Sequence, residues 1–203
     1  MRTKLTIFLL LTAFIFAQPI SAVAVSAGSA IVVEASTGRV VFEKDADSRR
    51  PMASTTKIMT ALVALEAGDT ARQVSVSGEA VGVEGSSVYL KTGDNLTLDD
   101  LVWALMLESA NDAAAAIAIE VAGSVEAFAG MMNAKAKELG LPDTHFTNPH
   151  GLDDENHYTT ARDLAKLAAY ALKNQVYRYM PFEEHHGAPL VKNKPYRLYL
   201  KLI

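Results

Sequence analysis

Hydrophobic and polar positions repeat along this chain with two different periods, and their order predicts a mixed α/β protein. Residues 30–34 and 39–43 are rich in β-branched side chains and are joined by Ala35-Ser36-Thr37-Gly38. That arrangement predicts a β-hairpin with glycine at the turn. Residues 55–67 instead carry apolar side chains three and four positions apart, the spacing of one face of a helix. A hairpin is therefore expected to precede the first helix.

Capping residues mark the helices that follow. Thr97-Leu98-Asp99-Asp100 and Thr160-Ala161-Arg162-Asp163 both have the form of a capping box, in which Asp163 is a capping carboxylate. The second box leads a helix to about residue 174. Residues 112–122 are alanine-rich and almost uniformly apolar, which predicts a buried central helix ended by Gly123. Ser124 caps one more helix, which runs to about residue 139.

Residues 141–159 have no hydrophobic period, and a loop of this length in a compact domain is usually functional. The loop holds His145, His150 and His157. Their irregular spacing offers no preformed metal site, so we expect neither a metal nor another cofactor.

The composition limits the classes of function that remain. The chain has 203 residues, of which 50% are hydrophobic and 21% charged, as in an ordinary globular domain. Its net charge is −4 and no basic cluster stands out, so nucleic acid is not an expected partner. The absence of cysteine excludes disulfides and thiolate metal sites.

The first 24 residues have the features of a signal peptide. Arg2 and Lys4 supply positive charge, residues 5–17 are apolar, and Ala22-Val23-Ala24 offers a small-residue cleavage site. The apolar run is short for a membrane span. We therefore expect export to the periplasm or the extracellular cell envelope. The mature chain would have a net charge of −6 and no membrane span.

Ser54-Thr55-Thr56-Lys57 is the motif of this chain that points most directly to catalysis. Residues three apart on a helix are neighbours, so the Lys57 amine can lie over the Ser54 hydroxyl. Serine needs an adjacent base to become a nucleophile, and lysine serves once its pKa is lowered. The alternative is structural, with Ser54 as a helix cap and Lys57 as a solvated first-turn residue.

A second motif, Ser109-Ala110-Asn111, lies where one predicted helix ends and the buried helix begins. With both motifs present, the chain resembles the serine penicillin-recognising enzymes, and specifically the low-molecular-weight D-alanyl-D-alanine carboxypeptidases. The resemblance covers about residues 30–175 in the family's order and spacing. It is carried by residues 37–47, 53–66, 85–101, 108–118 and 146–165.

The resemblance implies an α/β (α+β) fold of the β-lactamase/transpeptidase type, with a helical cluster packed on an antiparallel sheet and Ser54 in the cleft between them. It implies that Ser54 is the acyl-enzyme nucleophile and Lys57 its general base. Ser109 would relay the proton, and Asn111 would hold Lys57 and the substrate amide. His150 would help to hold the hydrolytic water. The implied substrate is a peptidoglycan stem peptide ending in D-Ala-D-Ala, with β-lactam antibiotics as inhibitors.

The family also has a later Lys-Thr-Gly motif, and here the match fails. The single Lys91-Thr92-Gly93 precedes Ser109, which is the wrong order, so we interpret it as a turn. From the sequence we expect a signal peptide at 1–24, a partial catalytic domain at 25–175 and an atypical tail at 176–203. The C-terminal sheet strands would be missing, and the chain alone would be poorly stable and weakly active or inactive.

Two other functions stay open at this point. One is a secreted serine β-lactamase, which shares the Ser-x-x-Lys and Ser-x-Asn elements. The other is a non-catalytic cell-wall binding protein or pseudoenzyme. Trp103, the single tryptophan, is expected in the core rather than in a substrate platform.

Overall fold

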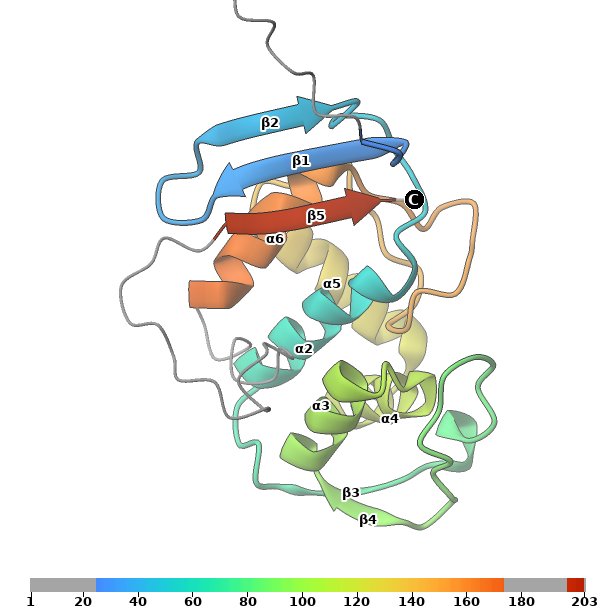
Figure 1. Cartoon of the computed structure of the whole chain (residues 1–203). Coiled ribbons are helices and arrows are strands. Elements are labelled where there is room, and N and C mark those ends of the chain that lie inside the picture. Colours follow the sequence, from blue (N-terminus) through green and yellow to red (C-terminus); the bar gives the residue numbers. More distant parts are fainter. Residues whose placement is uncertain (1–24, 174–196, 203) are drawn as a thin grey trace, which may run out of the picture.

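The computed structural model of the chain describes residues 25–173 and 197–202, which form a small antiparallel sheet and a cluster of helices (Figure 1). The predicted hairpin is confirmed: β1 (Ser29–Glu34) pairs antiparallel with β2 (Val40–Lys44). Gly38 has φ +74° in the turn between them, a conformation that glycine adopts without strain. The predicted signal peptide and residues 176–196 of the predicted tail lie outside the described residues.

The sheet holds one strand more than we expected. β5 (Arg197–Leu202) pairs antiparallel with the free edge of β1, so that the strand order is β2-β1-β5. Leu198, Leu200 and Leu202 alternate with other residues, which is the period of a strand. This alternation covers only a few residues, and it does not show which strand they would pair with. Pairing between distant segments is decided by tertiary structure.

The helices form a layered cluster beneath the sheet (Figure 1). α6 lies directly under the sheet and contacts β1 and β5, while α2 and α5 occupy the middle of the molecule. α3 and α4 lie at the far end beside the short hairpin of β3 and β4. The elements are η1 (Ala53–Thr56), α2 (Lys57–Glu66), β3 (Gln73–Ser75), η2 (Gly78–Ala80), β4 (Asn95–Thr97), α3 (Leu98–Leu107), α4 (Asn111–Ala122), α5 (Val125–Glu138) and α6 (Ala161–Lys173).

α4 is the buried helix that the sequence predicted, although it lies at the end of the molecule away from the three-stranded sheet (Figure 1). It contacts α2, α3 and α5, and all its residues from Asn111 to Ala118 are buried. Alanine side chains such as Ala113 and Ala114 allow neighbouring helices to approach closely, and Gly123 ends the helix with φ +82°. Trp103 packs against the same core as a half-buried residue, as expected.

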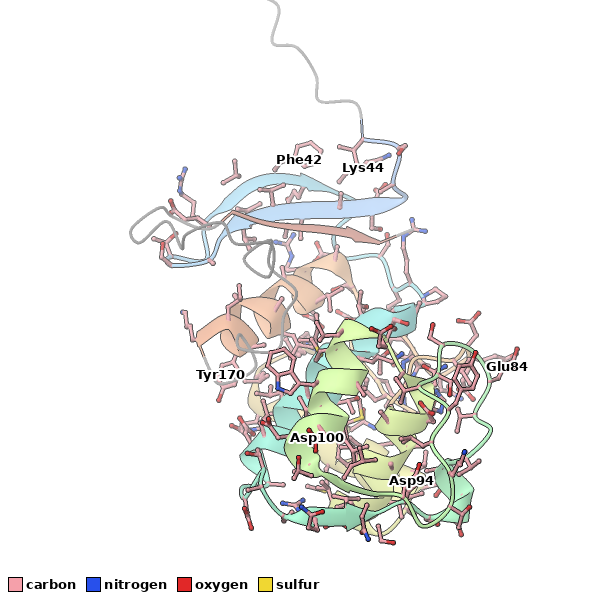
Figure 2. All side chains as sticks on the ribbon, turned by 60° about the horizontal axis from the view of Figure 1, so that its bottom comes forward. Phe42, Lys44, Glu84, Asp94, Asp100 and Tyr170 are labelled. Carbon is pink, nitrogen blue, oxygen red and sulfur yellow. The ribbon has the colours of Figure 1, made fainter. Side chains whose placement is uncertain are left out.

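One predicted capping box is complete and the other is half formed. Thr97 Oγ1 accepts from the Asp100 N–H at 3.0 Å, and the Asp100 carboxylate accepts from the Thr97 N–H at 3.0 Å (Asp100 is labelled in Figure 2). Thr160 Oγ1 likewise accepts from the Asp163 N–H at 3.1 Å. The Asp163 carboxylate, however, binds residues of the preceding loop. The prediction that it caps the helix is therefore wrong.

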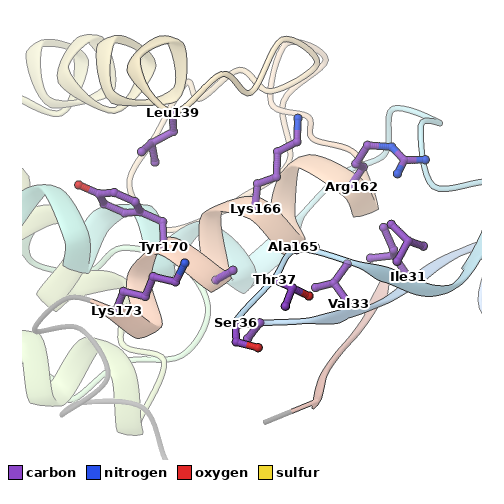
Figure 3. A pocket seen from close by; sticks show the side chains of 14 residues that line it. Ile31, Val33, Ser36, Thr37, Leu139, Arg162, Ala165, Lys166, Tyr170 and Lys173 are labelled. Atoms are coloured by element: carbon purple, nitrogen blue, oxygen red, sulfur yellow. The ribbon is translucent and has the colours of Figure 1, made fainter. Parts of the chain in front are cut away.

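A cavity of 430 Å³ lies between the β1–β2 turn and α6 (Figure 3). Ile31 and Val33 line it from the sheet, and Ala165 and Tyr170 line it from the helix. None of the residues with predicted chemistry lines it, so it is separate from the candidate site. In the part of the chain that the structure describes, no single helix is long and apolar enough to cross a membrane; α4 and α5 meet that test only as a pair bent by 83°.

Candidate active site

The turn that carries Ser54 is tightly wound. η1 is a 3₁₀ turn, and in this geometry side chains three positions apart eclipse each other. Lys57 Nζ accordingly lies 3.2 Å from Ser54 Oγ. Ser54 is exposed, whereas Lys57 is only 3% exposed. The predicted proximity is therefore present, and the alternative that Lys57 is a solvated residue is wrong.

Three oxygen atoms surround the amine of Lys57. Besides Ser54 Oγ, they are Asn111 Oδ1 and the backbone carbonyl of His150, each at 2.7 Å. A neutral amine has two N–H donors and one lone pair. It can therefore donate to the two carbonyl oxygens while it accepts the proton of the Ser54 hydroxyl. Burial lowers the pKa of Lys57 to about 8, so that roughly a tenth of the amine is neutral at pH 7, far more than for an ordinary lysine.

Asn111 is held in place on both sides of its side chain. Its Oδ1 accepts from Lys57, and its Nδ2 donates to the Glu84 carbonyl at 2.5 Å (Glu84 is labelled in Figure 2). The Asn111 N–H donates to the Ser86 carbonyl at 2.7 Å. A Cβ at Gly85 would lie 2.6 Å from Asn111 Nδ2, so glycine allows the loop to approach. The amide is thus fixed in one orientation beside Lys57.

Ser109, two residues before Asn111, is half-buried and has φ +55°. This left-handed conformation costs a non-glycine residue about 1–3 kcal/mol, and such residues concentrate at functional sites. Ala53, which precedes Ser54, also has a positive φ, of +46°. Strained backbone therefore adjoins both motifs. The proton relay assigned to Ser109 stays a prediction.

Asp112 is an anchor beside the candidate site that the sequence reasoning missed. Its buried carboxylate accepts from Ser87 Oγ at 2.6 Å and from the Leu90 and Val88 N–H groups at 2.9 and 3.3 Å. Burial alone would raise its pKa, but these hydrogen bonds outweigh burial and lower it. Asp112 thereby fastens the loop that contacts Asn111 to the start of α4. The sequence feature that could have revealed this anchor is a carboxylate in the first turn of the otherwise apolar helix α4.

The long loop of residues 141–159 lies against η1 and α2. Thr60 Oγ1 donates to the Pro149 carbonyl at 2.6 Å, and Thr56 Oγ1 lies 2.7 Å from His157 Nε2. Gly151 packs against the carbonyl of Ala53 and has φ +90°. The loop therefore contacts the turn that bears Ser54 and Lys57.

His150 contacts Lys57 through its backbone carbonyl rather than through its imidazole. The ring accepts from the Leu152 N–H at 3.3 Å through Nδ1. Burial, and after it the charge of Lys57, lower the pKa of the His150 imidazole to about 4. The ring is therefore neutral near neutral pH.

The other histidines make contacts of their own. His145 Nδ1 lies 2.6 Å from the Asn156 carbonyl, and its ring stacks on Tyr158. Among residues 25–173 and 197–202 there is no group of three or more potential ligand side chains arranged to hold a metal. 

Lys91-Thr92-Gly93 is a turn, as interpreted from the sequence. The Lys91 N–H donates to the Asp94 carboxylate at 2.8 Å, and the Gly93 N–H donates to the Val76 carbonyl at 2.9 Å. All three residues of the motif are exposed.

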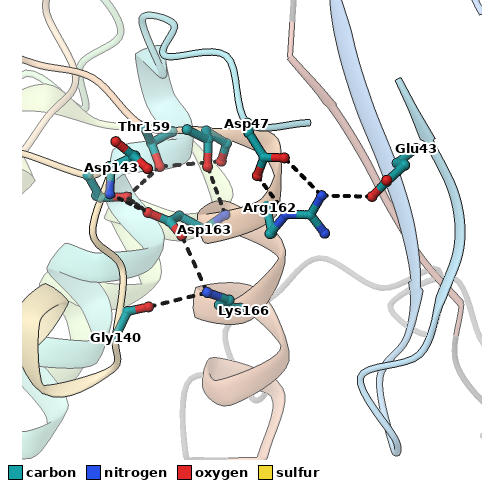
Figure 4. A network of polar contacts seen from close by, with 10 residues as sticks. Glu43, Asp47, Gly140, Asp143, Thr159, Arg162, Asp163 and Lys166 are labelled. Carbon is teal, nitrogen blue, oxygen red and sulfur yellow. Dashed lines mark hydrogen bonds and ion pairs between the residues drawn. The ribbon is translucent and has the colours of Figure 1, made fainter. Parts of the chain in front are cut away.

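A polar network anchors the ends of the long loop to α6 (Figure 4). Asp163 accepts from the Asp143 N–H at 2.9 Å and from Thr144 Oγ1 at 3.0 Å, and Thr144 Oγ1 lies 2.8 Å from Thr159 Oγ1. Arg162 on the same helix turn pairs with Asp47 at 2.6 Å and with Glu43 of β2 at 2.8 Å. Exposed ion pairs each contribute roughly 0–1 kcal/mol, so their role here is chiefly to fix position.

Comparison with known proteins identifies the family of this chain. A protein-family model described as D-alanyl-D-alanine carboxypeptidase matches residues 15–198. The chain therefore belongs to the D-alanyl-D-alanine carboxypeptidase family, a family of serine hydrolases.

Individual relatives give the extent of the match. The chain is 40% identical over 158 residues to D-alanyl-D-alanine carboxypeptidase DacF of Bacillus subtilis, covering 75% of this chain and 41% of the relative. It is 41% identical over 167 residues to DacC of Escherichia coli, covering 77% and 42%. The chain thus spans about two fifths of the length of these relatives.

Solved structures confirm the fold class. The D-alanyl-D-alanine carboxypeptidase DacD from Francisella tularensis matches with a TM-score of 0.74 and 34% identity, over 82% of this chain and 43% of that one. The DD-transpeptidase of Streptomyces K15 matches with a TM-score of 0.73 and 35% identity, over 78% and 65%. A helical cluster packed on an antiparallel sheet is therefore the shared architecture.

Proposed function

We propose that this chain is a serine D-Ala-D-Ala carboxypeptidase that forms an acyl-enzyme on Ser54. The observation that carries the proposal is the position of the Lys57 amine, buried and 3.2 Å from Ser54 Oγ, with two carbonyl acceptors for its own protons. The names of the relatives supply the substrate class. It is a peptidoglycan stem peptide that ends in D-Ala-D-Ala.

The first half of the reaction transfers an acyl group to Ser54. Neutral Lys57 takes the hydroxyl proton while Ser54 Oγ bonds to the carbonyl carbon of the penultimate D-alanine. The peptide C–N bond then breaks, and the proton reaches the leaving amine of the terminal D-alanine, with Ser109 as the relay. The products are a serine ester and free D-alanine.

The second half hydrolyses that ester. Water adds to the ester carbonyl, the Ser54 oxygen leaves with a proton, and the shortened stem peptide is released. The neutral imidazole of His150 is proposed to hold this water, because the residue already lies at the site through its backbone carbonyl. Asn111 orients Lys57, and we propose that it also binds the amide of the substrate.

Covalent labelling tests the nucleophile directly. The chain is incubated with benzylpenicillin, digested and examined by mass spectrometry. An adduct on the peptide that contains Ser54, absent from the Ser54→Ala variant, is expected, at a yield below one per chain because the sequence predicts weak activity. No adduct, or an adduct on another residue, would refute the assignment.

A peptide assay tests the reaction class. Release of D-alanine from a pentapeptide ending in D-Ala-D-Ala is expected of the carboxypeptidase. Rapid turnover of penicillin without D-alanine release would indicate the β-lactamase function, and acylation with neither activity would indicate a penicillin-binding pseudoenzyme.

We also propose that the protein acts outside the cytoplasmic membrane and takes part in peptidoglycan and cell-shape maintenance. The signal-like segment of residues 1–24 and the location of peptidoglycan support this. N-terminal sequencing of the secreted chain, with cleavage after Ala24, is the test.

A further inference from the structure

His157 makes a contact that the proposed mechanism does not use. Its side chain is buried, with 3% of the residue exposed, and its Nε2 lies 2.7 Å from Thr56 Oγ1. Thr56 stands between the proposed nucleophile and its base in sequence. A buried histidine on the long loop is thus bonded to the one turn whose geometry sets the Ser54–Lys57 distance.

The tautomer of His157 follows from its second ring nitrogen. Nδ1 lies 3.1 Å from the backbone nitrogen of Thr147, which can only donate. Nδ1 must therefore be unprotonated, and in the neutral ring the proton is on Nε2. Nε2–H consequently donates to Thr56 Oγ1. Burial is the main cause that lowers the pKa of His157, to about 4, so this tautomer persists at neutral pH.

The bond belongs to a row of contacts between the loop and the catalytic turn. Thr56 contacts His157, and Lys57 contacts the His150 carbonyl one residue later. Thr60, one helical turn further, contacts the Pro149 carbonyl. Of the three contacts, the one to Thr56 is formed by a histidine ring. The Thr147 N–H and an edge-to-face contact with the Phe146 ring, 5.8 Å between centroids, fix the orientation of that ring.

We propose that His157 is a positioning residue for catalysis, which acts through Thr56 to hold the Ser54–Lys57 pair in register. The inference rests on the proposed function, because it assigns His157 a part in the same reaction. Since Thr56 Oγ1 is attached to the backbone between the two reacting residues, its release would let the 3₁₀ turn rotate. Rotation would lengthen the Ser54–Lys57 contact and admit water to the Lys57 amine.

Two near-isosteric variants separate the two bonds of the ring. In His157→Gln the side-chain amide reaches the Nε2 position and keeps a donor for Thr56. In His157→Asn the amide oxygen occupies the Nδ1 position and still accepts from the Thr147 N–H. The shorter side chain no longer reaches Thr56 Oγ1. We expect the acylation rate of His157→Asn to be about tenfold below that of His157→Gln, because small displacements of reacting groups have large effects on rate.

A double-mutant cycle links the effect to Thr56. Thr56→Val removes the hydroxyl at similar volume, and it should lower the acylation rate by about the same factor. His157→Asn should then have no further effect in the Thr56→Val background. Thr144→Val is the matched control, since it removes another loop hydroxyl, bonded to Thr159 and Asp163. It should lower the melting temperature and leave the acylation rate unchanged.

The titration of Lys57, followed by NMR of its side-chain nitrogen, gives a readout that needs no reaction. Its midpoint should rise from about 8 toward 10.5 in Thr56→Val and His157→Asn, and stay in place in Thr144→Val. Equal rates and equal midpoints for His157→Asn and His157→Gln would overturn the inference. If the unmodified chain is not acylated, the proposed function fails, and the Lys57 midpoints alone decide the role of His157.

Discussion

Among the glycines that the structure describes, Gly151 is the one at which an added Cβ would come nearest to other atoms, so Gly151→Ala is the sharpest steric test. A Cβ at this position would overlap the carbonyl oxygen of Ala53, and it would lie 2.5 Å from the carbonyl carbon and 2.9 Å from Thr56 Oγ1. Gly151 also has φ +90°, a conformation that alanine seldom adopts. Because backbone atoms cannot rotate aside as a side-chain end can, the loop and η1 must separate.

The magnitude follows from two contributions. The positive φ costs alanine roughly 1–2 kcal/mol. The overlap adds about 1–3 kcal/mol, the range for overpacked cores. Together they predict a loss of roughly 2–5 kcal/mol of stability, or a fall of about 5–15 °C in Tm for a domain of this size. The acylation rate should fall by about 10²-fold, since a displacement near 1 Å of the Ser54 turn has that effect.

Gly38→Ala provides the matched control. Gly38 has φ +74°, but a Cβ there would have no atom within 4 Å, so that only the backbone strain remains. Thermal unfolding and penicillin acylation of both variants separate strain from overlap. If Gly151→Ala melts within about 2 °C of Gly38→Ala, a difference of no more than about 1 kcal/mol, and is acylated like the unmodified chain, the steric overlap has no effect and the reasoning is refuted.

Three further predictions concern the amine, the loop anchor and a helix cap. Acylation should accelerate as pH rises through about 8, because the Lys57 amine loses its proton there, and stopped-flow acylation from pH 6 to 10 checks this. Asp112→Asn should cost roughly 1.5–3 kcal/mol in urea unfolding, because hydrogen bonds to a charged group are lost. The pKa of Asp112 is lowered in the fold, so the unmodified chain should lose this contribution as pH falls through that depressed pKa, whereas the variant should not. Thr97→Ala should cost about 1 kcal/mol with the acylation rate unchanged, and Thr97→Ser should restore the stability.

Several parts of the fold were predictable because they depend on neighbours in sequence. The β1–β2 hairpin, the Thr97 capping box and the end of α4 at Gly123 each involve residues only a few positions apart. The Ser54–Lys57 contact belongs to the same class, since it spans one turn. Local propensity and spacing carry this information directly.

The sequence did not predict hydrogen-bond partners that come from distant parts of the chain. Asp163 was expected to cap its own helix, but its carboxylate binds Asp143 and Thr144, because the packed loop brings stronger donors within reach. β5 was not predicted, and the expectation that the sheet would hold only its first strands was wrong in this respect. Its ladder with β1 joins segments separated by more than 160 positions.

Local sequence specified the first hairpin and the helices, and it placed a hydroxyl and an amine on one turn. Only the tertiary structure decided that the amine is buried, that Asn111 and the His150 carbonyl accept its protons, and that Asp112 and His157 hold the surrounding loops. The physical reason is that the pKa of Lys57 is lowered by burial, and that the oxygen atoms which accept its protons lie more than 50 positions away in the chain. Such contacts exist only once the helices and loops have packed together.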